Sequence, residues 1–212
     1  MKKLTVAALA VLLVVGLSTT GSAQFFMSQL SDARVIGSDE VQVGGGFSVF
    51  ENLLGLGGFI RIGVINELEV GAKLGFVNFD NDFGDDHTGL TLGADLLYQF
   101  LDTEYGDPID LSTGGGIEYY NFPGDATFLM FGSNTLVSYP VEFESGQVLS
   151  PFFRLNLRFD RIDNGVDDTE FELGFGFGAK FDITRYFGFF GEIIIAGGAI
   201  DEGFVGGVTF GI

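Results

Sequence analysis

Apolar and polar residues alternate along most of the chain after Val41. In the segment 170–183, every second residue is Phe, Leu, Ala or Ile, and the residues between them are Glu, Gly, Lys or Asp. Successive side chains of a strand point to opposite faces, so this alternation predicts a strand with one apolar and one polar face. Ten segments follow the pattern: Val41–Phe50, Gly58–Ile65, Leu68–Phe79, Thr88–Leu101, Ile109–Tyr120, Thr127–Tyr139, Pro151–Arg161, Glu170–Ile183, Phe187–Ala196 and Gly203–Ile212.

The connectors between these segments also alternate in length and composition. The even-numbered segments are followed by Asn66-Glu67, Asp102–Pro108, Glu144–Gln147 and Thr184–Tyr186. The odd-numbered segments are followed by more acidic stretches: Glu51–Gly57, Asp80–His87, Asn121–Ala126, Ile162–Asp168 and Gly197–Glu202. The pattern predicts an all-β fold, a single antiparallel up-and-down transmembrane β-barrel of ten strands, with eight as the alternative. With an even number of strands, both chain termini would then lie on the side of the shorter turns, which we expect to be the periplasm.

Three features favour an outward-facing apolar face, as in a membrane barrel. The 25 Phe residues would overfill the interior of a soluble barrel of this size. The polar face is rich in Gly, which suits a crowded lumen. The tyrosines fall at strand ends or in turns, where aromatic girdles form: Tyr98, Tyr105, Tyr119, Tyr120, Tyr139 and Tyr186. Because an unpaired backbone group in hydrocarbon costs several kcal/mol, the first and last strands must pair near Val43 and Val208.

The N-terminus predicts export. Lys2 and Lys3 precede the apolar stretch Leu4–Leu17, and Gly21-Ser22-Ala23 supplies a small-residue cleavage site, so residues 1–23 are interpreted as a signal peptide. Residues 24–40 would form a periplasmic N-terminal lead, either a short helix under the barrel or a flexible segment, and residues 41–212 the barrel. The mature chain would carry 8 basic and 29 acidic residues, a formal charge of 8 − 29 = −21, which argues against nucleic acid as a partner.

The signal segment, the ten alternating strands, the short Asn66-Glu67 turn and the Phe-rich last strand together resemble bacterial outer-membrane β-barrel proteins of the small OmpA/OmpX-like kind. The resemblance implies a location in the bacterial outer membrane. It implies as partners the lipid bilayer, periplasmic chaperones and the barrel assembly machinery. Members of this class usually end in an aromatic residue, whereas here Phe210 is third from the end and Ile212 is last. The resemblance is architectural and carries over no functional residues.

The polar face predicts a charged, acidic lumen. We expect its lining to include Arg61, Glu69, Lys73, Asp95, Glu118, Arg154, Arg158, Glu170, Glu172, Lys180 and Glu192. Buried charges need partners, and matched hairpin registers suggest the pairs Arg61–Glu69, Arg158–Glu172 and Lys180–Glu192. Such a lumen fits either a structural barrel or a narrow cation-preferring pore, because rings of carboxylates favour cations.

Other functions receive less support from the sequence. A binding or adhesion barrel would act through its loops, which are short. An outer-membrane enzyme would need a site around His87, the only histidine, within Asp85-Asp86-His87. A lone loop histidine beside acids is usually solvated, so we expect no enzyme, catalytic residue, cofactor or metal site. The acidic stretches at 80–86 and 163–168 lack the glutamate that closes a twelve-residue calcium loop.

Overall fold

A computed structural model describes residues 32–50, 53–79, 87–121, 127–163, 167–196 and 202–212. Within these ranges the chain forms ten long strands, a two-residue strand β7 and one turn of 3₁₀-helix, η1 (Thr103–Tyr105). The strands are β1 (Val41–Phe50), β2 (Leu53–Ile65), β3 (Leu68–Phe79), β4 (His87–Leu101), β5 (Asp110–Asn121), β6 (Thr127–Ser138), β7 (Val141–Glu142), β8 (Val148–Asp163), β9 (Asp167–Thr184), β10 (Phe187–Ala196) and β11 (Glu202–Gly211). No helix of the described residues is long and apolar enough to cross a membrane.

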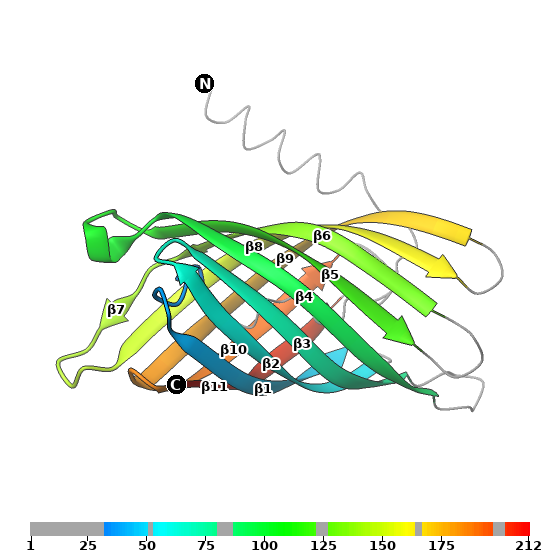
Figure 1. Cartoon of the computed structure of the whole chain (residues 1–212), viewed down its shortest axis with the longest axis horizontal. Coiled ribbons are helices and arrows are strands. Elements are labelled where there is room, and N and C mark those ends of the chain that lie inside the picture. Colours follow the sequence, from blue (N-terminus) through cyan, green and yellow to red (C-terminus); the bar gives the residue numbers. More distant parts are fainter. Residues whose placement is uncertain (1–31, 51–52, 80–86, 122–126, 164–166, 197–201) are drawn as a thin grey trace, which may run out of the picture.

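The ten long strands close into a single antiparallel barrel (Figure 1). Each pairs with its neighbours in sequence, β6 pairs with β8, and β1 pairs with β11 to complete the cylinder. The closing register sets Val43 opposite Phe210 and Gly45 opposite Val208. The predicted up-and-down topology is therefore confirmed, and so is the pairing of the first and last strands.

The apolar face points outward, as the Phe-rich pattern predicts. On β2, Ile60 and Ile62 are 42% and 44% exposed, whereas Arg61 between them is 1% exposed. The same contrast recurs around the barrel, with exposed Leu, Ile, Val and Phe outside and buried charged or polar side chains inside. A single-residue shift in register would exchange these faces, so the buried charges of β2–β5 and β8–β10 fix the register of those strands.

Three strands begin three or more residues earlier than the hydrophobic pattern indicates: β2, β8 and β9, the last at Asp167 rather than Glu170. β2 begins at Leu53 rather than Gly58, and the expected loop Glu51–Gly57 shortens to residues 51–52. Glycines in this stretch hide the alternation, but Leu54 and Leu56 remain on the outer face. β8 begins at Val148 rather than Pro151, and β7 pairs with its first two residues.

We call the two ends of the barrel the turn end and the loop end. The turn end holds the start of β1, the end of β11 and the connectors after β2, β4, β6 and β9, including η1 and β7 (Figure 1). The loop end holds the connectors after β1, β3, β5, β8 and β10.

The tyrosines form a one-sided girdle. Tyr98, Tyr105, Tyr139 and Tyr186 are exposed at the turn end, each 40% or more. Tyr119 is exposed on the outer face towards the loop end. The prediction for Tyr120 is wrong, because this side chain is 2% exposed and faces the lumen: β5 keeps its alternation, so its two adjacent tyrosines cannot share a face.

Candidate functional site: the lumen of the barrel

The structure places the predicted lumen residues in two groups of ion pairs on opposite sides of the barrel. Ten of them are at most 8% exposed: Arg61, Glu69, Lys73, Asp95, Glu118, Arg154, Arg158, Glu172, Lys180 and Glu192. The eleventh, Glu170, lies opposite Asp160 in the β8–β9 register, but its side chain is outside the described part of the structure. Charged side chains buried to this degree need compensating charges, and the geometry supplies them.

The first group is a continuous ladder of charges across β2, β3, β4 and β5. Arg61 contacts Glu69 and lies 3.7 Å from Asp95. Lys73 lies 2.9 Å from Asp95 and 3.3 Å from Glu118. Basic and acidic groups therefore alternate from near the turn end towards the loop end. Such a ladder restricts the motion of each member, because every charge is shared by two partners.

Glycines make this ladder possible. Arg61 of β2 and Asp95 of β4 face each other across Gly71 of β3, which is in register with both. A β-carbon on Gly71 would lie 2.7 Å from Oδ1 of Asp95. Gly93 of β4 lies in the same way between the lysine and the glutamate of the next pair, and its β-carbon would lie 2.9 Å from the glutamate side chain. The inward glycines therefore leave room for long side chains to meet over an intervening strand.

The second group lies on β8, β9 and β10. Arg158 contacts Glu172, directly opposite on β9, and lies 2.6 Å from Asp160 of its own strand. Nε of Arg154 donates a 2.8 Å hydrogen bond to Oε1 of Glu192. The five side chains of this second group are at most 2% exposed.

The predicted pair Lys180–Glu192 is wrong. Lys180 faces the turn end and lies 3.3 Å from Asp182, whereas Glu192 reaches over β9 to Arg154. The reason is again a glycine: a β-carbon on Gly176 would overlap Oε1 of Glu192, so only glycine lets this carboxylate cross the strand. Hairpin register predicts ion pairs only between adjacent strands. It therefore cannot reveal an ion pair whose side chains meet across an intervening strand.

The N-terminal lead enters the turn end of the lumen in its described part, residues 32–40. Residues 32–40 form no helix and contact the barrel wall. Its backbone N–H groups donate to side chains of the barrel wall, from Ala33 to Ser138 Oγ (3.3 Å) and from Val35 to Gln99 Oε1 (3.0 Å). The N–H of Ile36 donates to Glu69 Oε2 (3.0 Å), which links the lead to the first ladder. The lead therefore occupies one end of the barrel, instead of lying beneath it.

Arg34 is the main ionic contact of the lead. Its Nη2 donates to Ser150 Oγ at 3.2 Å and to Asp182 Oδ2 at 3.1 Å, and its Nε lies 3.2 Å from Asp32 Oδ2. The charge of Asp32, and to a smaller extent that of Asp182, raises the pKa of Arg34 above its ordinary value. Burial alone would raise the pKa of Asp32, but the charges of Lys180 and Arg34 outweigh it and hold that pKa below its ordinary value of 3.8.

Gly63 of β2 receives the backbone of the lead. Its N–H donates to Glu40 O (3.0 Å), and its carbonyl accepts from Asp39 N–H (3.1 Å). A β-carbon at Gly63 would overlap the carbonyl oxygen of Gly37 and lie 2.7 Å from that of Ile36. The close approach of the two backbones therefore requires glycine at position 63.

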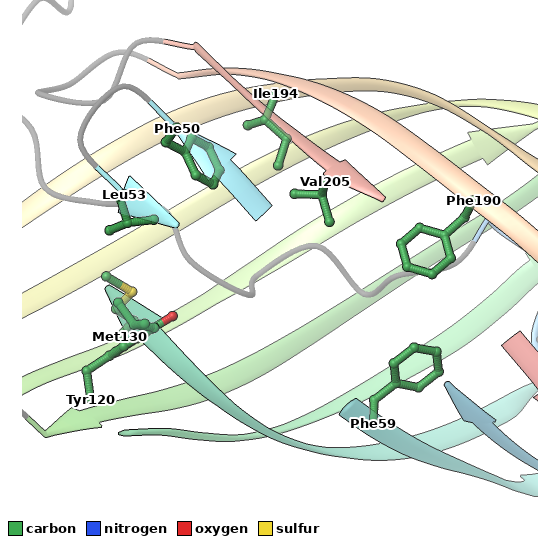
Figure 2. Close-up of a cluster of buried hydrophobic side chains, with 9 residues drawn as sticks. Phe50, Leu53, Phe59, Tyr120, Met130, Phe190, Ile194 and Val205 are labelled. Carbon is green, nitrogen blue, oxygen red and sulfur yellow. The ribbon is translucent and has the colours of Figure 1, made fainter. Parts of the chain in front are cut away.

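An apolar cluster fills the lumen near the loop end (Figure 2). Its members are at most 6% exposed: Phe50, Leu53, Phe59, Val77, Tyr120, Met130, Phe190, Ile194 and Val205. Figure 2 shows these side chains projecting inward from strands around the barrel, with the rings of Phe59 and Phe190 6.5 Å apart in an edge-on arrangement. The sequence analysis did not single out this cluster. The available signal was the presence of apolar residues at inward positions of the alternation.

Charge is unevenly distributed among the described groups of the lumen. Six basic side chains, those of Arg34, Arg61, Lys73, Arg154, Arg158 and Lys180, accompany nine acidic ones: Asp32, Glu69, Asp95, Asp110, Glu118, Asp160, Glu172, Asp182 and Glu192. A cavity of about 550 Å³ opens beside the lead at the turn end, lined in part by Arg34, Glu40, Asp102, Lys180 and Arg185. Among these described groups, acidic side chains therefore outnumber basic ones by 9 − 6 = 3.

The two regions considered for catalysis or metal binding fall largely outside the described structure. Residues 80–86 and 164–166 are not described, nor is the side chain of His87. Among the described residues, no group of three or more His, Cys, Asp or Glu side chains has the arrangement of a metal site.

Comparisons with known proteins bear on the fold. No protein-family model matches the chain, and no curated protein matches it. Among solved structures, the β domain of the Bordetella autotransporter Brka aligns with 82% of this chain and 98% of its own length, at a TM-score of 0.55 and 10% identity. The N-terminal β-barrel domain of Pseudomonas aeruginosa OprF aligns with 84% of this chain and all of its own, at a TM-score of 0.41 and 13% identity. The KdgM porin aligns with 80% of this chain and 98% of its own, at 0.39 and 8%.

The closed barrel, its outward apolar face and the similarity to the Brka β domain together define the class of fold. The chain is an antiparallel β-barrel of the kind found in outer-membrane proteins. At 10% identity the similarity establishes the fold alone.

Proposed function

We propose that this protein is an integral β-barrel of the bacterial outer membrane whose lumen is closed, so that its main role is structural. One observation supports the closed state above all others: the charged side chains of the lumen are buried and paired with each other. In a conducting pore, rings of charge face water and pass ions between them. Here opposite charges of the protein occupy those positions.

The two ends of the lumen support the same proposal. The lead occupies the turn end, and the apolar cluster excludes water near the loop end. A hydrophobic constriction opposes ion passage because an ion would have to shed its hydration shell there. An ion would therefore meet three successive obstacles along the axis.

The outer surface supports the membrane location. Its exposed Leu, Ile, Val and Phe side chains would be costly in water and are favourable in hydrocarbon, and each of the ten long strands has a partner on both sides. Export by residues 1–23, delivery by periplasmic chaperones and insertion by the barrel assembly machinery belong to the same proposal. Catalysis and loop-mediated adhesion are not part of it.

Conductance of the purified full chain in a planar lipid bilayer tests the closed lumen. We expect no unitary current steps at moderate voltage, with the same preparation denatured by heat as the control for contaminating channels. Stable steps that are lost on denaturation would overturn the closed barrel. Cation selectivity of those steps would instead support a narrow pore, which the acidic excess of the lumen favours.

Extraction and gel mobility test the membrane location separately. We expect the protein to require detergent for extraction and to migrate differently on SDS gels before and after boiling. A protein that remains soluble and monomeric without detergent would refute the membrane barrel, whatever its conductance.

A further inference from the structure

The described part of the lead, residues 32–40, fits the turn end closely, yet few apolar contacts hold these residues. Ala33 packs on Leu97 and Leu136, and Val35 lies beside them. The remaining contacts are hydrogen bonds and ion pairs next to the cavity, where Arg34 and Asp182 are 21% and 20% exposed. Polar contacts near water contribute less to stability than the burial of a large apolar surface.

The contacts are nevertheless specific. Three strands of the wall, β6, β4 and β3, each present an acceptor to a backbone N–H group of residues 33–36. These acceptors are Ser138 Oγ, Gln99 Oε1 and Glu69 Oε2. The guanidinium of Arg34 is held by acceptors on β8 and β9. Gly63 has no side chain, so the backbone of residues 36 and 37 can pack directly against it.

We propose that residues 32–37 form a releasable plug, and that the turn end of the lumen is a binding surface for this segment of the protein's own lead. Release of the plug would join the cavity of about 550 Å³ to the lumen and expose Ser138, Gln99 and Glu69. This inference deepens the proposed function, because it identifies the segment that closes one end of the barrel.

The plug is coupled to the interior through Glu69. One oxygen of this carboxylate accepts from the lead and the other contacts Arg61. Release of the lead therefore removes a hydrogen bond from the first ladder. The obstacles nearer the loop end remain in place, so release alone is expected to leave the bilayer conductance unchanged.

Thiol labelling of the full chain tests the plug directly. The chain has no cysteine, so Ala33→Cys introduces a unique thiol at a buried position, and Ser145→Cys introduces one in an exposed turn as the matched control. We expect a water-soluble maleimide to label Ala33→Cys much more slowly than Ser145→Cys in the folded protein. Removing the ionic contact by Arg34→Ala should accelerate labelling of Ala33→Cys at least about tenfold, the effect of losing a charge-assisted hydrogen bond. High salt should act in the same direction, since it screens partly exposed pairs.

Two results would overturn the inference. Equal labelling of Ala33→Cys and Ser145→Cys would mean that the lead is not docked. Slow labelling that neither Arg34→Ala nor salt changes would mean that the lead is a fixed part of the core. A second variant, Gly63→Ala, adds a β-carbon that would overlap the backbone of residues 36 and 37, without changing an ionic group. This variant should also accelerate labelling of Ala33→Cys. The readout does not depend on conductance, so a conducting barrel with a protected Ala33→Cys would refute the closed lumen while retaining the plug.

Discussion

Replacing Arg154 by alanine removes one partner of an ion pair that water does not reach. The side chains of Arg154 and Glu192 are 0% and 2% exposed, and their 2.8 Å hydrogen bond crosses the intervening strand. In Arg154→Ala the carboxylate of Glu192 loses this counter-charge. The variant also loses the guanidinium that lies 5.7 Å from the centre of the Phe152 ring.

The expected loss of unfolding free energy is about 3–5 kcal/mol, the usual effect of leaving one charge of a buried pair uncompensated. Removing both charges together, as in Arg154→Met with Glu192→Met, should cost much less than the sum of the single changes, because no buried charge is left alone.

Unfolding by urea in lipid vesicles provides the measurement. The chain contains no tryptophan, so far-UV circular dichroism or the fraction of heat-modifiable protein on a gel is a suitable signal. A double-mutant cycle between the two positions gives the coupling energy, and a second cycle between Lys180 and Glu192 serves as the control. We expect strong coupling in the first cycle and weak coupling in the second.

A loss of unfolding free energy below about 0.5 kcal/mol for Arg154→Ala would refute this reasoning, because substitutions at water-exposed surface sites usually cost no more than that. It would mean that the lumen is hydrated, and it would favour the cation-preferring pore. Stronger coupling of Glu192 to Lys180 than to Arg154 would refute the assigned pairing.

Three further predictions concern a lumen glycine, the lead and the outer surface. Gly176→Ala should destabilise the barrel because its β-carbon would overlap the carboxylate of Glu192, whereas Gly191→Ala, whose β-carbon would have ordinary contacts, should cost less than about 1 kcal/mol of unfolding free energy by the same urea titration. The docking contributed by Asp32 should be complete above pH 3.8 and decline as the pH falls through its depressed pKa, so hydrogen exchange of the lead amides, corrected for intrinsic rates, should accelerate as the pH falls below about 4; protection that does not decline in that range would contradict this sign. Phe177→Arg on the outer face, where the native side chain is 53% exposed, should lower the stability in vesicles by about 2–4 kcal/mol near the bilayer midplane, and an unchanged stability would argue that this face does not contact lipid.

Much of the fold could be predicted because a strand has a side-chain period of two. Strands β1, β3 and β10 begin and end where the alternation does. Prediction was weaker where glycine interrupts the pattern, as in the first half of β2, because glycine supports strand pairing without marking a face. The adjacent tyrosines of β5 show that residue type alone can also mislead. Their type suggested that both belong to an aromatic girdle, but strand geometry places them on opposite faces of the barrel wall.

The sequence by itself determined a barrel with an apolar exterior and a charged interior, because alternation assigns each side chain to a face without knowledge of its neighbours. The tertiary structure decided which charges meet. Arg154 and Glu192 are brought together over Gly176 by the curvature and register of three strands, and Arg34 reaches Asp182 because the lead turns back into the lumen. The two residues of the first contact are 38 positions apart in sequence, and those of the second are 148 apart. The first contact requires three adjacent strands, and the second requires the lead to lie inside the closed barrel, so neither follows from alternation along one strand.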